Sequence, residues 1–381
     1  MTPTGLNKVT EIIPISTDPR LQRGFAQIIF HLISTKSCLM SEWARSAYNF
    51  AAFIKKSCRF FRNKRVNWKI SPEILRYILP RFEHKKFIPI LIDPSFVKNR
   101  IVGSPSKTRN DQQKAEKGFF LLSAAIPVQG RAISFFQFVW RNTQIGYRVY
   151  ESLNSMFAIQ FIKIRDLLKS VGSKAVFIMD RGFGYEYFLD KCPSIGVHYV
   201  IRVRDLKTRI VLVRNKKECP IAELVSRMKE DTICYKVYYK GTIYTNLIIR
   251  KKGRHVWVLA SDISDPSAVV NLYKQRMKIE ETFKDWKSTG FDIEKIQIRQ
   301  WDILLKIIWC VVIAHMILYL MGEIICRSKQ TKFLFKKFIQ DKSSMSMVQI
   351  AWKAWLFAQN DILPVLPTLK SRLIALRKAS L

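Results

Sequence analysis

Four residues with reactive side chains share helical spacing in one short stretch, YKQRMKIEETFKDWK at 273–287. Tyr273, Arg276, Glu280 and Lys287 lie three, four and seven residues apart, and at about 100° per residue these steps place all four within an arc of roughly 60°. The ridge presents a phenol, two cations and one carboxylate over about 21 Å. It suits a phosphate backbone with chemistry at one point along it. The alternative is a solvated face with ordinary ion pairs at i,i+3 and i,i+4.

Local signals predict that this ridge belongs to one helix. Asp265 is a good N-cap, Pro266 suits the first helical position, and Gly290 follows as a stop. An apolar stripe beside the ridge predicts the face that packs on a core; its members are Leu272, Ile279, Phe283 and Trp286. Glu281 falls roughly 100° away from Glu280, so the two carboxylates are not interchangeable.

Two further carboxylates end apolar runs of strand length. KFIPILID at 86–93 ends on Asp93, and SKAVFIMD at 173–180 ends on Asp180. Sites in open α/β sheets form outside the carboxyl ends of the strands, so both aspartates are candidates for one site with Glu280. The alternative for each is a strand-terminating turn residue.

Three carboxylates on two strands and one helix are what a two-metal phosphoryl-transfer site needs. Mg²⁺ or Mn²⁺ prefers oxygen ligands, and two such ions about 4 Å apart can serve an in-line displacement. The sequence has no phosphate-binding loop of the G-x-x-x-x-G-K-[ST] type, and its five histidines show no paired metal-ligand spacing. An ATP-driven machine, a zinc hydrolase and a serine hydrolase are therefore disfavoured.

Composition indicates a polyanionic partner. The chain of 381 residues has 65 Lys and Arg against 29 Asp and Glu, a net charge of +36. Nucleic acid is the first candidate and an anionic membrane surface the second. The longest apolar run, 307–321, is short for a membrane span and predicts a buried core helix. The seven cysteines are scattered without a CxxC pair, which fits a reducing cytoplasmic interior.

A basic stretch at 55–69, KKSCRFFRNKRVNWK, contains no acidic residue. Cations grip phosphates and flat rings stack on bases or pack in a core, so this stretch predicts a DNA contact. The alternative is a solvated basic helix whose aromatic rings belong to the core. The cations assigned to DNA here are Lys55, Lys56, Arg59, Arg62, Lys64 and Arg65.

The order of predicted elements divides the chain into five parts. Residues 1–85 predict a helical region, and 86–203 alternate strands and helices in the pattern of a mixed α/β layer. Short β-like runs fill 204–262, helices return in 263–326, and 327–381 predict a helical C-terminal region. The stretch at 97–118 is polar, basic and rich in helix breakers, and it predicts a loop whose role stays open.

The spacing Y-x2-R-x3-E-x6-K, met by Tyr273, Arg276, Glu280 and Lys287, resembles the signature of the DDE transposases of bacterial insertion sequences. More narrowly, it is similar to the cut-and-paste IS-four family, and VWVLASD at 256–262 resembles the branch that forms DNA hairpins. The resemblance covers roughly Asp93 to Trp309. It implies an α/β fold with an RNase H-like mixed sheet flanked by helices and a β-rich insertion between the second aspartate and the glutamate.

The resemblance also implies residue roles. Asp93, Asp180 and Glu280 correspond to the catalytic metal ligands, with two Mg²⁺ or Mn²⁺ ions per site. Tyr273, Arg276 and Lys287 correspond to residues that hold the phosphates of the transposon end. Trp257 lies where relatives stack a tryptophan on a flipped base, with a core aromatic as the alternative. Two arginines after the second strand resemble DNA contacts; these are Arg202 and Arg204.

The function implied is a DNA transposase that cleaves transposon ends and joins them to target DNA, through a hairpin intermediate. Its partners are the terminal inverted repeats, the target DNA and a second copy of the chain in a synaptic dimer, with no membrane. The helical region 1–85 is then a DNA-binding region, and 327–381 a dimerisation candidate. Two alternatives stay open: another RNase H-like nuclease of the junction-resolvase type, and an inactive DNA-binding repressor of the parent element.

Overall fold

The fold is taken from a computed structural model. It describes residues 15–45, 49–99, 104–105, 117–141, 150–228, 231–253, 255–298, 300–327 and 345–357. The polar stretch predicted at 97–118 is described only at its ends and at 104–105; the rest of it lies outside these residues, as does the basic segment 328–344.

Within the described residues the strands form one 11-stranded mixed sheet, with the order β2-β3-β1-β5-β6-β11-β10-β9-β7-β8 and β4 paired to β3. Strands β1, β5 and β6 are parallel to one another, and β3, β4 and β11 run antiparallel to their neighbours. The strands are β1 (Ile88–Lys98), β2 (Ser104–Pro105), β3 (Lys117–Pro127), β4 (Ala132–Trp140), β5 (Ala175–Met179), β6 (His198–Arg202), β7 (Arg209–Leu212), β8 (Glu218–Pro220), β9 (Thr232–Tyr239), β10 (Ile243–Lys252) and β11 (His255–Ser261). This mixed sheet flanked by helices confirms the predicted RNase H-like fold class.

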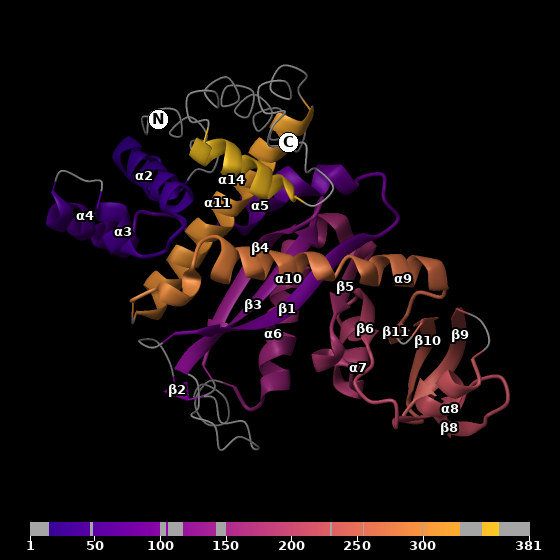
Figure 1. Cartoon of the computed structure of the whole chain (residues 1–381). Helices are drawn as coiled ribbons and strands as arrows, with labels where there is room; N and C mark the ends of the chain where they lie inside the picture. Colours follow the sequence, from indigo (N-terminus) through magenta and orange to yellow (C-terminus); the bar gives the residue numbers. More distant parts are fainter. Residues whose placement is uncertain are drawn as a thin grey trace.

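Helices surround this sheet (Figure 1). Those before β1 are α2 (Pro19–Thr35), α3 (Met40–Ala44), α4 (Phe50–Arg62), α5 (Ser71–Ile78) and the 3₁₀ turn η1 (Leu79–Phe82). Those after β4 are α6 (Leu153–Leu167), η3 (Lys169–Lys174), η4 (Arg181–Phe183), α7 (Glu186–Ser194), α8 (Ile221–Ser226), α9 (Pro266–Lys274), α10 (Met277–Lys284), η6 (Ile293–Lys295), α11 (Trp301–Arg327) and α14 (Met347–Phe357).

The longest of these helices, α11, is buried. It is apolar and long enough to cross a membrane by length and composition, but most of it lies inside the protein. It packs between β4 and helices α2, α4 and α14. Trp352 on α14 donates its indole N–H to the carbonyl of Ile33 on α2, at 2.8 Å. Helix α11 therefore joins the terminal helices to the sheet, as a core helix does.

Strand β1 is longer than its sequence pattern predicts. The apolar run was expected to end on Asp93, but the strand continues to Lys98. The continuation exists because β3 pairs with β1 as far as Lys98, opposite Gly118, whereas parallel pairing with β5 stops at Ile92. Asp93 therefore lies inside a strand, at the position where its parallel neighbour has just ended.

The segment at 204–262 extends the same sheet. Strand β11 pairs with β6 of the first part, and β10, β9, β7 and β8 follow outward in that order. Tyr199 on β6 donates its hydroxyl to Thr245 on β10 at 2.9 Å, which links the two parts through a buried contact. The β-rich segment is thus continuous with the sheet of the candidate site.

The predicted helix at 273–287 consists of three segments. Asp265 caps α9 as expected, accepting from the backbone N–H groups of Ser267 and Ala268. Arg276 lies between α9 and α10, where i,i+3 backbone bonds tighten the turn, and a π-helical turn at Asp285–Thr289 follows α10. Helices α9 and α10 run in line across the strands in Figure 1, and α10 contacts β4, β3 and β1.

A buried ion pair anchors α10 to the sheet. Arg131, at the start of β4, contacts both carboxylate oxygens of Asp285, with Nε–Oδ2 at 2.6 Å and Nη2–Oδ1 at 3.1 Å. His315 Nε2 on α11 lies 3.3 Å from the same Oδ2. The neighbouring Ala132 N–H donates to Thr282 Oγ1 at 2.9 Å. These contacts fix the distance and rotation of the helix that contains Glu280.

The first prediction concerns this ion pair. Asp285→Asn should lower the free energy of unfolding by about 3–5 kcal/mol, because loss of one partner leaves the Arg131 charge buried without compensation. Denaturant unfolding measures the change. Glu281→Gln is the matched control: its side chain is 41% exposed and lies 3.8 Å from Arg131, so its loss should change stability by less than about 1 kcal/mol. Equal effects of the two substitutions would contradict the assignment.

A pH dependence follows from the same carboxylate. Burial alone raises the pKa of Asp285, but hydrogen bonds from His315 and Arg131 hold this pKa below its ordinary value of 3.8. A lowered pKa in the folded state stabilises the protein above the ordinary value, and this stabilisation is lost as the pH falls through the folded-state pKa. The stability difference between the wild type and Asp285→Asn should be constant near neutral pH and shrink below about pH 4. A difference that grows on acidification would contradict this.

Candidate active site

The two strand aspartates stand on neighbouring parallel strands. Asp93 follows the last residue of β1 that pairs with β5, and Asp180 follows the last residue of β5. Asp93 is buried, with 7% of its surface exposed. The Asp180 side chain is 31% exposed and caps the turn that follows, because its Oδ1 accepts from the Gly182 N–H at 2.7 Å. Adjacent parallel strands thus bring the two carboxylates to one edge, as the sequence predicted.

Helix α10 contributes the third carboxylate, Glu280. The Arg276 side chain, just before this helix, links Glu280 to the two aspartates. The Arg276 Nη2 lies 3.1 Å from Asp93 Oδ1 and 3.6 Å from Asp180 Oδ2. Its Nη1 donates to Glu280 Oε1, one helical turn further along. The three candidate carboxylates therefore converge on one guanidinium group, whose side chain is only 12% exposed.

The charges in this cluster are strongly coupled. Burial raises the pKa of Asp93 to about 7; the Arg276 charge opposes the rise, and the charges of Asp180 and Glu280 add to it. Burial by itself lowers the pKa of Arg276, but Asp93 and Glu280 outweigh it and hold this pKa above its ordinary value. Three carboxylates this close need a cation among them.

The other members of the predicted ridge are placed differently. Lys287 lies in the π-helical turn and donates its ammonium group to the Phe96 carbonyl on β1, at 2.5 Å. Burial lowers the pKa of Lys287. Tyr273 is buried, and its ring meets the Trp257 ring edge-on with centroids 5.2 Å apart. The ridge is therefore partly turned inward, because the tight turn at Arg276 and the π turn at 285–289 both depart from 100° per residue.

The arginines predicted after β5 lie at the end of β6. Arg202 is partly buried, and its Nη2 lies 3.5 Å from the Val256 carbonyl, on the strand that contains Trp257. Arg204 is exposed, and its N–H bonds to the Gly184 carbonyl at 3.4 Å. Trp257 itself is partly buried. All three thus lie beside the loop that follows Asp180 or beside Tyr273.

Two glycines shape the loop after Asp180, a role that the sequence patterns above did not assign to them. A Cβ atom on Gly184 would lie 2.3 Å from the Arg202 carbonyl oxygen and 2.7 Å from the Arg204 nitrogen. Gly182 presents the N–H that caps Asp180. The signal was present in the sequence as DRGFG at 180–184, since paired glycines after a strand indicate close backbone approach.

The basic stretch lies on α4 and the turn after it. All six assigned cations are exposed there: Lys55, Lys56, Arg59, Arg62, Lys64 and Arg65. The aromatic rings belong to the core, because Phe60 and Phe61 are buried and both contact Trp68, with centroids 6.0 Å apart. Of the two roles open to these rings, packing is the one observed.

The donor set suits a hard divalent cation. Carboxylate oxygens are the ligands that Mg²⁺ and Mn²⁺ prefer, and three of them already surround one positive charge. Among the described residues, however, no group of three or more His, Cys, Asp and Glu side chains is arranged to hold a metal ion. The Arg276 guanidinium lies between the carboxylates.

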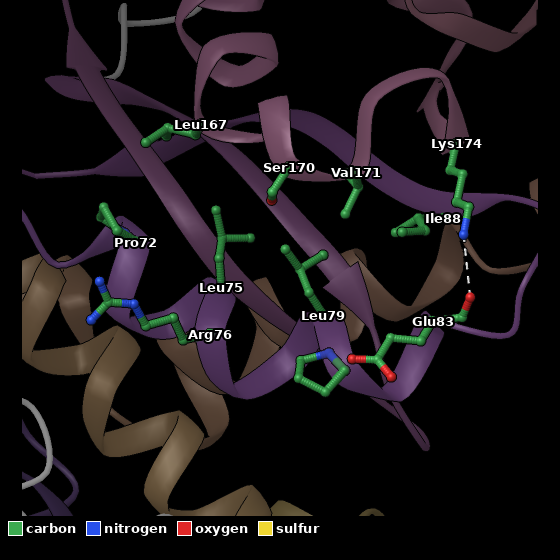
Figure 2. Close-up of a pocket in the computed structure, with 11 residues that line it drawn as sticks. Pro72, Leu75, Arg76, Leu79, Glu83, Ile88, Leu167, Ser170, Val171 and Lys174 are labelled. Atoms are coloured by element: carbon green, nitrogen blue, oxygen red, sulfur yellow. Dashed lines mark hydrogen bonds between the residues drawn. The ribbon is translucent and has the colours of Figure 1, made fainter. Parts of the chain in front are cut away.

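A hollow of about 610 Å³ lies at the other end of the same strands (Figure 2). Ile88 at the start of β1 and Lys174 just before β5 line it, and Lys174 donates to the Glu83 carbonyl at 3.2 Å. Apolar side chains from α5 and η1 make up much of the wall, among them Leu75 and Leu79. The carboxylates lie beyond the opposite strand ends, so this hollow is separate from the candidate active site.

Comparison with known families agrees with the geometry. Residues 160–317 match the family model described as the transposase DDE domain. The region of the chain that contains the end of β5, the β-rich segment and α10 is thus similar to this domain. The matched span contains Asp180 and Glu280 and begins after Asp93. No curated protein matched the chain.

The next prediction tests the loop after Asp180. Gly184→Ala should lower the free energy of unfolding by about 1–3 kcal/mol, because backbone atoms must move to admit the Cβ atom. Gly24→Ala is a control of opposite sign: Gly24 lies inside α2 with its nearest neighbour at 3.4 Å, so alanine should add about 0.5–1 kcal/mol. Denaturant unfolding measures both. A stabilising Gly184→Ala would show that the loop does not need glycine.

Proposed function

We propose that this chain is a DNA transposase of the DDE class, which cleaves the ends of a transposable element and joins them to target DNA. The observation that carries the proposal is the meeting of Asp93, Asp180 and Glu280 on a single cation at one edge of the sheet. The transposase DDE domain at 160–317 and the net charge of +36 support it. We further infer a cut-and-paste pathway with a hairpin, as in the IS-four family.

In this proposal Asp93, Asp180 and Glu280 would hold two Mg²⁺ or Mn²⁺ ions, which when bound supply Lewis-acid activation of a water or 3′-hydroxyl and charge neutralisation. The protein contributes position and electrostatics. Asp180 is pre-oriented by its bond to Gly182, and Glu280 is held by the anchoring of α10 to β4. Preorganised charge of this kind accounts for much of the rate in phosphoryl transfer.

Cations and rings around the carboxylates would hold the DNA. We assign phosphate contacts to Tyr273, Arg276, Lys287, Arg202 and Arg204, and a stacking contact to Trp257. The ring of Trp257, which is partly buried and meets the buried Tyr273 ring edge-on, supports the stacking assignment. Aromatic rings of this kind stack on unpaired bases.

The domains follow the same division of roles. The helical region at 1–85 would bind DNA, 86–203 and 263–326 form the catalytic core, and 204–262 the β-rich insertion. Because both ends of an element must be cut and joined together, the active form would be a homodimer in a synaptic complex, located in the bacterial cytoplasm. The C-terminal region 327–381 is our candidate for the dimer contact.

A prediction for the site compares substitutions of two neighbouring carboxylates, Glu280 and Glu281. The full chain, a duplex with the inverted repeat that borders the gene, and Mg²⁺ should give nicked and hairpin products. Glu280→Gln should lower cleavage by at least about 100-fold, because a direct ligand outweighs outer-shell groups worth 10–100-fold, with DNA binding largely intact. Glu281 contacts Lys284 and Arg131 and none of the clustered carboxylates, so Glu281→Gln should cleave normally. Normal cleavage by Glu280→Gln would refute the assignment.

The same assay separates the alternatives. A resolvase-type nuclease would cut branched DNA and join no strands to a target. An inactive repressor would bind the duplex and release no product at any metal concentration. Detection of strand-transfer products in a supercoiled target plasmid is therefore the outcome that distinguishes a transposase from both.

Another prediction concerns the exposed cations of α4. Arg59→Gln with Arg62→Gln should weaken DNA binding and reduce the slope of log K against log salt by up to about 2, one per lost phosphate contact. Lys163→Gln with Lys169→Gln removes the same charge from exposed positions on α6 and η3 and should leave the slope nearly unchanged. Fluorescence anisotropy across a salt series measures both. Equal slopes for the two variants would remove α4 from the DNA interface.

A further inference from the structure

One side chain occupies the centre of the candidate active site. The Arg276 guanidinium approaches Asp93 at 3.1 Å and Asp180 at 3.6 Å, and it bonds directly to Glu280. These carboxylates come from β1, from the end of β5 and from α10, so elements far apart in sequence meet at one cationic group. The group is mostly buried and lies where the proposed metal ligands converge.

We infer that Arg276 is an internal counter-cation that closes the metal site of the free protein, and that a DNA phosphate must draw it out before metal ions bind. The inference rests on the proposed function, since it assigns the three carboxylates to metal. It adds an order of events, in which DNA binding precedes metal binding. An enzyme with this order cannot cleave until a DNA end is bound.

Electrostatics makes the two occupants compete for the site. A guanidinium and a divalent cation have charges of the same sign, and at about 4 Å in a partly buried site they repel each other more strongly than they would in water. Each hydrogen bond from Arg276 also occupies a lone pair that an ion would otherwise use.

Arg276 is also suited to the alternative partner. Its Nε, which is buried, has no acceptor among the described residues, so one donor of the fork is left unused by the carboxylates. A guanidinium fork matches the oxygens of a phosphate with two parallel hydrogen bonds. Since DNA can shift the equilibrium only by its differential affinity for the two arrangements, the unused donor supplies part of that difference.

The test is a Mn²⁺ titration of the full chain, with free Mn²⁺ followed by electron paramagnetic resonance. Without DNA, Arg276→Met should bind Mn²⁺ about 5- to 150-fold more tightly than the wild type, the usual range for coupled sites. For the wild type, a duplex with the bordering inverted repeat should tighten Mn²⁺ binding by a factor in the same range. No cleavage is measured, so the readout is independent of activity.

Lys287→Met is the matched control. It removes the same charge from the same stretch, 273–287, but the Lys287 ammonium group bonds to the Phe96 carbonyl and not to a carboxylate of the cluster. It should therefore raise Mn²⁺ affinity much less than Arg276→Met does. If Arg276→Met does not fold, Arg276→Lys keeps the charge without the planar fork and should give an intermediate Mn²⁺ affinity, with Mn²⁺ raising its melting temperature more than that of the wild type.

The outcomes separate the inference from the proposed function. Mn²⁺ binding by the wild type without DNA that equals that of Arg276→Met, or of Arg276→Lys, would overturn the inference and leave the metal site in place. Mn²⁺ binding by the wild type that DNA does not tighten would overturn the proposed order. If no variant binds Mn²⁺ under any condition while DNA binding persists, the carboxylates are not metal ligands and the proposed function itself falls.

Discussion

Mutual repulsion among three carboxylates is the constraint on which the described structure depends. Asp93, Asp180 and Glu280 are brought to one edge of a sheet, where burial of Asp93 and the charges of its two neighbours raise the free energy of its charged form. A cation must therefore be present, and Arg276 supplies it in this structure. Phosphoryl transfer needs the same concentration of negative charge in order to hold divalent ions. The arrangement that is electrostatically unfavourable for folding is thus the one that the proposed chemistry requires.

The anchoring of α10 explains how this charge is kept in place. A helix with a carboxylate facing two others is pushed away from the sheet, and the ion pair between Arg131 and Asp285 opposes that push from inside the core. Thr282 adds a bond to β4 beside it. The contacts lie on the helical turns after Glu280, so the helix is fixed close to the site without any anchor entering it.

Local sequence patterns were enough for the parts of the site that depend on strand ends and caps. Apolar runs that end near Asp93 and Asp180 predicted neighbouring strands, and Asp265 with Pro266 predicted the start of α9. The mixed α/β layer followed from the alternation of these elements, and its RNase H-like character from the family resemblance. The exposed cations of α4 also follow from a local rule, since a run of basic residues without acid is solvated.

The remainder depends on contacts between distant residues. Arg131 and Asp285 are 154 positions apart, and no spacing rule links them, so the π-helical turn that begins at Asp285 had no local signal. The inward turn of Arg276 is of the same kind, because it depends on an aspartate 183 positions away. The extension of β1 beyond Asp93 was hidden because its partner β3 continues where β5 has stopped.

The most direct test of the account is a crystal structure of the full chain with the terminal duplex and Mn²⁺, with the ions located by anomalous scattering. The account predicts Mn²⁺ peaks among the carboxylates of Asp93, Asp180 and Glu280, with the Arg276 guanidinium on a DNA phosphate. A structure in which Arg276 still bridges these carboxylates, with DNA bound and Mn²⁺ at other residues, would contradict it.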